Sequence, residues 1–323
     1  MSALVFSFLL LVTGPADTVS SHTAGVGVEL NRADDIYIYR LPTSGQGQSA
    51  IRPEASGQSV LADSLPYDLQ NPVVAINFPS EDLLEISALG PTDEPGIFCA
   101  ISDEKGEILF IDGNNGGAIV RRAFFRDKGD FEGVEKVGKC LYALKSNGDL
   151  YEIENWDKKR PRSRQYSTSI SKTDDAEGLC YDIRRQALLI ACKGNPDSAY
   201  RRDVYAFDLQ AKQLGQTPVF SVDPVEVNRL VPHATDEKHG YFSPSGIAIH
   251  PLTGDVYIIS TALKRLVVLD YQSGAIRFAV RLNKKLLPQP EGIAFDPEGN
   301  LYLSSEGKKG GEGLFFRFDY KKQ

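Results

Sequence analysis

Short apolar runs, separated by turn residues, follow one another along most of this chain. The clearest example lies near the C-terminus, where the apolar run 291–295 leads into the turn Asp296-Pro-Glu-Gly-Asn300 and a second run at 301–305. A third run, 314–320, is rich in aromatic residues. Aromatic and β-branched residues bounded by Gly and Pro are typical of strands rather than helices. The pattern therefore predicts three consecutive strands over residues 291–320.

The same order of strands and turns occurs earlier in the chain, at 246–282 and at 97–125, and the copy at 246–282 contains four strands. Each copy opens on a short phrase. The phrases begin at Glu85, Glu132, Glu177, Ser245 and Glu291. Their starts lie 47, 45, 68 and 46 residues apart. A period in the forties with four strands per repeat is typical of the blades of a β-propeller.

The last repeat lacks a fourth strand because the chain stops at Gln323. An isolated apolar run, 72–78, precedes the first repeat, and we expect it to complete the fifth blade, since closure of the ring removes open sheet edges. The predicted fold is all-β, a five-bladed propeller with four antiparallel strands per blade. The 68-residue spacing makes a six-bladed ring the alternative, but its extra stretch 225–241 is rich in Pro, His and charge and lacks paired apolar runs.

Three regions are predicted along the chain. Residues 1–19 read as a signal peptide or N-terminal anchor, because the apolar run 3–12 is too short for a span of ~20 residues and small residues follow it. Residues 20–64 are rich in Ser, Gly, Gln and Pro and read as a flexible linker. Residues 65–323 form the propeller. We therefore expect an exported protein, periplasmic, envelope-bound or secreted, without a transmembrane span beyond an uncleaved anchor.

The composition narrows the range of partners. The net charge is −7, with 24% charged residues and no basic cluster on a predicted strand, which argues against a nucleic-acid partner. The densest basic run, 158–162, reads as a solvated turn. Cys180 and Cys192 flank one predicted hairpin, so a disulfide between them is one reading for an exported protein, and two buried thiols are the other.

Candidate chemistry comes from the opening phrases. Innermost strands of all blades start on the same face, so the first residues of the phrases should converge at one mouth of the central channel. Four carboxylates held together there repel, and each requires a proton or a cation. Calcium fits because it accepts six to eight oxygen ligands in loose geometry. The expected calcium ligands are Glu85, Glu132, Glu177, Ser245 and Glu291.

Further acids lie on the same predicted face. They are Asp103, Asp130, Asp175 and Glu306, as alternative ligands or as groups that support the ligands. The competing interpretation is that no metal binds, and that Lys145 and Lys193, which close two second strands, neutralise the ring as ion pairs.

Several phrases together resemble a known family. They are Glu85-Ile-Ser, Ser102-Asp-Glu-Lys-Gly106, Gly129-Asp-Phe-Glu-Gly133, Glu177-Gly-Leu, Ala191-Cys-Lys193, Ser243-Pro-Ser-Gly-Ile-Ala248, Gln289-Pro-Glu-Gly-Ile-Ala294 and Ser305-Glu-Gly307. This combination is similar to the SdiA-regulated family, also called YjiK-like, over residues 65–320. The resemblance implies a five-bladed propeller distantly related to NHL-repeat and gluconolactonase-like propellers, and a calcium site. It implies no particular biochemical activity.

The sequence leaves three functions open. The first is an exported, monomeric propeller whose calcium-containing channel mouth binds a small molecule or an envelope protein. The second is a calcium-dependent hydrolase of a lactone, ester or phosphoester, in which His233 or His239 activates water, although no catalytic nucleophile is recognisable. The third is that the cation is purely structural and holds the blades together.

Overall fold

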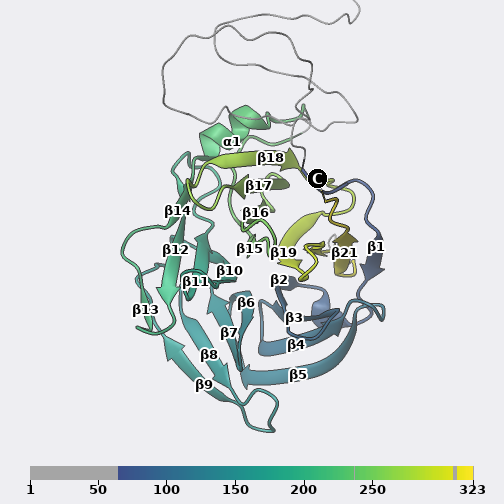
Figure 1. The fold of residues 1–323 in the computed structure, drawn as a ribbon, viewed down its shortest axis with the longest axis vertical. Coiled ribbons are helices and arrows are strands. Elements are labelled where there is room, and N and C mark those ends of the chain that lie inside the picture. Colours follow the sequence, from purple (N-terminus) through teal and green to yellow (C-terminus); the bar gives the residue numbers. More distant parts are fainter. Residues whose placement is uncertain (1–64, 236, 308–310, 323) are drawn as a thin grey trace, which may run out of the picture.

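The computed structural model describes residues 65–235, 237–307 and 311–322. Within them five sheets of antiparallel strands stand around a central axis as the blades of a propeller (Figure 1). The fold predicted from the repeats is therefore confirmed. The expected signal peptide or anchor (1–19) and linker (20–64) lie outside the described residues.

Each blade runs from an inner strand at the axis to an outer strand at the rim. Blade one contains β2 (Ile86–Pro91), β3 (Ile97–Ser102), β4 (Gly106–Asp112) and β5 (Ala118–Arg126). Blade two contains β6 (Phe131–Val137), β7 (Cys140–Lys145), β8 (Leu150–Glu154) and β9 (Arg162–Tyr166). Blade four contains β15 (Gly246–Ile249), β16 (Val256–Ser260), β17 (Arg265–Leu269) and β18 (Ile276–Arg281).

Blade three departs slightly from this plan because its outer strand is divided. It contains β10 (Ala176–Asp182), β11 (Ala187–Cys192) and β12 (Arg202–Asp208), and both β13 (Gln213–Leu214) and β14 (Phe220–Val222) pair with β12. The two short segments together occupy the position that one strand fills in the other blades.

Blade five closes the ring with strands from both ends of the described chain. It contains β19 (Gln289–Phe295), β20 (Leu301–Glu306), β21 (Leu314–Phe318) and, as outer strand, β1 (Val74–Asn77). β1 pairs antiparallel with β21, with Ala75 opposite Phe316. A one-turn 3-10 helix (Glu81–Leu83) then leads into blade one. The predicted closing strand is thus confirmed.

The 68-residue spacing holds a helix and a loop, and no sixth blade occurs in the described residues. α1 (Pro224–Leu230) begins after Asp223, whose carboxylate accepts the backbone N–H of Val225 at 2.9 Å. Proline at the first helical position suits this start, since it has no N–H to satisfy. The buried side chains Val227 and Leu230 join the apolar cluster of blades three and four.

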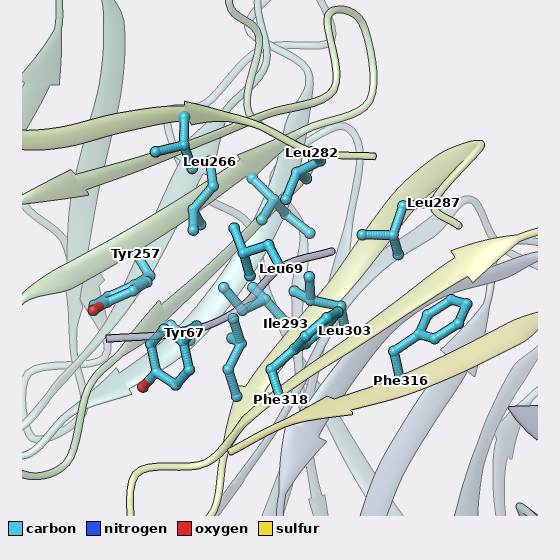
Figure 2. Packing of buried hydrophobic residues seen from close by; sticks show 14 of the residues in the cluster. Tyr67, Leu69, Tyr257, Leu266, Leu282, Leu287, Ile293, Leu303, Phe316 and Phe318 are labelled. Carbon is cyan, nitrogen blue, oxygen red and sulfur yellow. The ribbon is translucent and has the colours of Figure 1, made fainter. Parts of the chain in front are cut away.

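The hydrophobic core lies between neighbouring blades. Blades four and five share one cluster, into which the chain before β1 inserts Tyr67 and Leu69 (Figure 2). The hydroxyl of Tyr67 donates to the carbonyl of Gly299 at 2.6 Å. No helix in the described part of the chain has the length and apolar character that a membrane crossing needs.

The possible disulfide does not form, because all four cysteines are free thiols. The register of the hairpin explains this. Cys180 stands opposite Leu189, whereas Cys192 stands opposite Ala176, so the two thiols lie at different levels of the β10/β11 pair.

Candidate functional site

The inner strands share a local irregularity that aims one side chain at the axis. In each of four blades the ladder between first and second strand skips a single residue near the strand start. The skipped residues are Ser87, Glu132, Glu177 and Glu291. In blade four Ser245 stands at the corresponding place, immediately before β15. An extra residue of this kind is a β-bulge, which redirects a side chain.

A glycine follows the bulge in blades two, three and five, and follows Ser245 in blade four, because the next blade comes very close. A Cβ added at Gly178 would lie 2.9 Å from the side chain of Ile247. At Gly246 it would lie 2.5 Å from the carbonyl oxygen of Glu291. The repeated Glu-Gly or Ser-Gly phrase therefore combines a side chain at the axis with contact to the next inner strand.

Blade one uses different residues from those expected. Glu85 precedes β2 and is exposed, and the bulge position is occupied by Ser87, followed by Ala88. The prediction placed Glu85 at the position of the carboxylates in the other phrases, but the residue at that position is Ser87, two residues further along the chain. The hydroxyl of Ser87 donates to the carbonyl of Glu85 at 3.4 Å.

The bulges border a small cavity on the propeller axis, which we call the axial pocket. Its walls come from the inner strands of all five blades. They comprise Ala88, Leu89, Glu132, Glu177, Gly178, Leu179, Gly246, Ile247, Glu291, Gly292 and Ile293. Three of the five predicted ligand residues thus line one pocket, and Glu85 and Ser245 do not. The volume of about 10 Å³ is roughly that of one water-sized particle.

One carboxylate of the axial pocket has an ion-pair partner. Lys193 Nζ, which follows the end of β11, lies 2.9 Å from Glu177 Oε1. Burial raises the pKa of Glu177 to about 7, although Lys193 opposes this shift. The pKa of Lys193 is raised by Glu177, against the effect of burial. The ion pair considered for Lys193 is therefore present, whereas Lys145 forms none within the described residues.

The other two carboxylates lack such a partner in the described part of the chain. Burial raises the pKa of Glu132 to about 10, and the neighbouring charges of Glu177 and Asp130 add to the effect. Burial and the charge of Glu177 likewise hold the pKa of Glu291 well above its usual range, although the charge of Lys193 partly opposes the shift. Near pH 7 both side chains therefore favour the protonated form unless a cation is bound.

The further acids lie around this pocket on the same face. Burial raises the pKa of Asp103, and Glu85 and Glu104 raise it further. Burial also raises the pKa of Glu306, with Asp103 as the next cause. Asp175 shows the same direction through burial. Asp130 accepts a hydrogen bond from Ser146. We call Asp103, Asp130, Asp175 and Glu306 the acidic rim.

Two polar residues at the mouth carry roles that the sequence reading missed. Ser245 and Thr261 both donate to the carbonyl of Pro290, Ser245 at 2.6 Å and Thr261 at 2.5 Å, which joins blade four to blade five. Lys264 donates to the carbonyl of Thr261 at 2.7 Å, and burial lowers its pKa. A signal was available for Ser245 alone, because it stands at the phrase position.

The two histidines proposed as bases lie in the loop between α1 and β15. Their rings are 5.6 Å apart, and His233 Nε2 lies 3.0 Å from the carbonyl of Gly240. His233 is half-buried and His239 is exposed. Within the described residues neither histidine contacts a carboxylate of the axial pocket.

The arrangement does not amount to a ready-made metal cage. Across residues 65–235, 237–307 and 311–322, no group of three or more His, Cys, Asp or Glu side chains is placed to hold a metal ion together. The pocket brings together the carboxyl groups of Glu132, Glu177 and Glu291, and in the described residues only one ammonium group, that of Lys193, forms an ion pair with them.

These features define the class of protein: a five-bladed β-propeller with a carboxylate-lined axial pocket. The family model of the SdiA-regulated family matches residues 77–319. The chain belongs to this family, as the repeated phrases suggested.

Solved structures of other proteins have a similar fold. The chain is similar to Myxococcus xanthus glutaminyl cyclase, with TM-score 0.50 and 14% identity over 78% of this chain and 97% of that one. It also resembles a luciferin-regenerating enzyme, with TM-score 0.45 and 17% identity over 72% and 77% of the two chains. No curated protein sequence matches the chain. Likeness at such identities concerns the fold alone.

Proposed function

We propose that the protein is an exported binding module of the cell envelope, and that its axial pocket takes a calcium ion that forms part of the binding site. The observation that carries this proposal is the charge of the pocket. Glu132, Glu177 and Glu291 line it, and Lys193 is the single ammonium paired with them in the described residues. Burying carboxylates without compensation is costly, and a divalent cation removes that cost.

The donor chemistry and the size of the pocket support calcium. Carboxylate oxygens are the ligands that calcium prefers, and its coordination geometry is tolerant. The volume of about 10 Å³ has room for one ion and not for an organic molecule. Glu132 and Glu291 are the ligands we expect, with Glu177 held by Lys193. Since they form no closed cage, water or ligand oxygens would complete the coordination at the mouth.

Thermal unfolding in EDTA and across a calcium titration tests the metal site. An ion bound by the native state alone at one hundred times its Kd adds about 2.7 kcal/mol, which is roughly 5 to 10 °C in Tm for a domain of this size. We expect a saturable rise of this order in the unchanged chain and none in Glu132→Gln.

The matched control is Glu298→Gln, which removes an exposed carboxylate in the β19/β20 turn, at the opposite end of the inner strands. It should respond to calcium like the unchanged chain. Equal Tm values in EDTA and in saturating calcium, with no metal retained on purification, would contradict the proposal. Export is tested separately: after cell fractionation the full chain should be found in the envelope or the medium, and a purely cytosolic pool would contradict that part.

A hydrolase gains no support from the positions of His233 and His239, which make no contact with the pocket in the described residues. A purely structural cation is distinguished by its outcome. It would raise Tm in the same titration but would leave the mouth unable to bind any small molecule.

A further inference from the structure

The outer strand of blade two, β9, lies at the rim of the propeller, away from the axial pocket (Figure 1). Four of its five residues are exposed and none is buried. Within the described residues β9 pairs with a strand on one side only, the side of β8. The backbone N–H and C=O groups along its other edge therefore have no strand partner there, and an open edge of this kind can accept a further strand.

The two arginines of β9 lack the close ion pairs that arginines of other outer strands make. Arg122 of β5 pairs with a carboxylate at 2.7 Å, and Arg277 of β18 does so at 3.0 Å. On β9, Arg162 reaches Glu154 only at 3.9 Å. Arg164 forms no ion pair in the described part of the chain. The guanidinium charge of β9 is therefore largely uncompensated.

The register of β8 and β9 explains why Arg164 has no carboxylate partner. Glu152 stands directly opposite it, in a position from which opposite charges normally interact. Glu152 instead accepts hydrogen bonds from three other side chains at 2.6 or 2.7 Å, those of Lys212, Tyr142 and Tyr166. Arg164 donates to the hydroxyl of Tyr166 at 3.4 Å. Its charge is therefore available to a carboxylate that approaches from the open edge.

The turn before β9 adds to this charge. Lys158, Lys159 and Arg160 are all exposed, and among the described residues only Lys158 has an ion-pair partner, at 2.8 Å. Trp156 of the same turn stacks on Phe110 of blade one, with ring centroids 4.8 Å apart, which holds the turn against its neighbour. The basic run of this turn thus continues without interruption into the exposed strand.

We propose that β9 binds an extended acidic segment of another protein, which adds to blade two as a fifth strand. Side chains of such a strand alternate between the two faces of the sheet, and each stands directly opposite a residue of β9. Asp or Glu at every second position would therefore meet both Arg162 and Arg164, and these ion pairs would fix the register. Like charge keeps two copies of β9 from pairing with each other. The chain as a whole carries a net charge of −7, so the attraction is confined to this edge.

Two seven-residue peptides of the same composition, three Glu and four Thr, test this proposal. In one the Glu residues occupy every second position, and in the other they are consecutive. The full chain is titrated into each fluorescein-labelled peptide at low salt, and fluorescence anisotropy gives the Kd. EDTA in all buffers makes the result independent of the calcium site. The alternating peptide should bind about fivefold more tightly, and it should slow hydrogen–deuterium exchange of the β9 amides.

Two variants locate the binding. Arg164→Gln should weaken binding of the alternating peptide about threefold. Lys159→Gln is the matched control, because it removes one charge from the turn outside the strand and should leave the Kd nearly unchanged. Both side chains are exposed, so both variants should fold.

The other outcomes overturn the proposal. If the two peptides bind equally, or if both variants weaken binding equally, the edge attracts any polyanion and no strand is added. If neither peptide binds, or if the β9 amides exchange as fast with the peptide as without it, the basic edge serves only to keep strands of other molecules away.

Discussion

Lys193 and Glu177 form an ion pair at the centre of the propeller, with Nζ 2.9 Å from Oε1. Glu177 comes from β10, and Lys193 follows β11, so the pair joins the two innermost strands of blade three. The side chain of Glu177 is 6% exposed and that of Lys193 is 32% exposed. The carboxylate is therefore the partner that suffers if the pair is broken.

Lys193→Met should destabilise the protein above pH 7 and much less at pH 5. Lys193 opposes the burial that raises the pKa of Glu177 to about 7, so its electrostatic contribution exists where Glu177 is ionised and disappears as pH falls below that value. We expect a loss of about 2 kcal/mol at pH 8, reduced from the fully buried case because Lys193 is partly exposed. Urea unfolding in EDTA at both pH values measures it.

Lys145→Met is the matched control for this change. Lys145 closes the second strand of blade two as Lys193 does in blade three, but it has no ion pair in the described residues. It should unfold like the unchanged chain at both pH values. An equal loss at pH 5 and pH 8 in Lys193→Met would mean that the alkyl chain matters and the charge does not.

Gly246→Ala should disturb the contact between blades four and five. The new Cβ would lie 2.5 Å from the carbonyl oxygen of Glu291, an atom of the backbone that cannot move aside alone. Overpacking of this kind costs about 1–3 kcal/mol. The control is Gly215→Ala, where the nearest atom is 3.4 Å away and no loss is expected. Denaturant unfolding compares the two, and equal stabilities would contradict the close-approach explanation of the repeated glycines.

Most of the fold could be predicted from the sequence because the sequence signals for its strands and turns are local and repeated. Alternating strands, turn residues and a spacing in the forties predict blades, and the missing outer strand of blade five predicts a donor elsewhere, which β1 provides. α1 was missed although Asp223-Pro224 is a helix-start signal, because seven residues hold too few turns to show a helical period. The divided outer strand of blade three had no signal at all.

The residues of the site could be predicted only in part, because which side chains meet there depends on how the blades are arranged around the axis. In blade one, Ser87 and Ala88 keep the bulge and the small residue after it, but Ser87 has no carboxylate. The carboxylate pattern of the other phrases therefore pointed to Glu85 instead. Which acids are buried at the axis follows from the convergence of five blades, and no single repeat contains that information. The chain does bring Glu132, Glu177 and Glu291 to one pocket, as the phrases indicated.

Replacing either of two buried carboxyl groups of blade two by an amide should change the stability of the protein, in opposite directions for the two residues. Burial raises the pKa of Glu135 to about 8, although the backbone N–H groups of Tyr181 and Lys136 partly offset it. Burial opposes the charge of Glu152 as well, but hydrogen bonds from Lys212, Tyr142 and Tyr166 more than offset it and lower the pKa. One side chain is thus held neutral, and the other is held ionised.

Glu135→Gln should therefore raise stability at high pH. The folded state keeps the proton of Glu135 where the unfolded state has lost it, so the unchanged chain loses stability as pH rises from about 4.5 to about 8. Between these two pH values the free energy of unfolding of the variant should fall by roughly 2–4 kcal/mol less than that of the unchanged chain. Glu152→Gln should instead cost about 2 kcal/mol at pH 7, because Lys212 keeps a half-buried charge without its partner. Urea unfolding at pH 5, 7 and 9 compares them, and a shared sign would refute the assignment.

His250 is the buried histidine of blade four, and it should make the protein sensitive to mild acid. Its ring is 0% exposed, and Nδ1 accepts the backbone N–H groups of Leu252 and Thr253. Burial lowers its pKa to about 4, although Asp255 partly opposes the shift. The unfolded chain therefore binds a proton between pH 6.5 and pH 4 that the folded chain does not. Stability present above pH 6.5 is lost as pH falls, by up to about 3 kcal/mol.

His250→Asn isolates this contribution. An asparagine side-chain oxygen can accept the same two backbone N–H groups, as a carboxylate oxygen of Asp182 does for Arg184 and Arg185 in blade three. The variant should be less stable at pH 7, because a smaller side chain leaves a cavity among Tyr257, Phe295 and Tyr320. Its stability should nevertheless fall less steeply from pH 6.5 to pH 4. Other groups titrate in that range in both proteins, so the difference between the two unfolding curves reports His250, and parallel curves would show that its ring takes up a proton without cost.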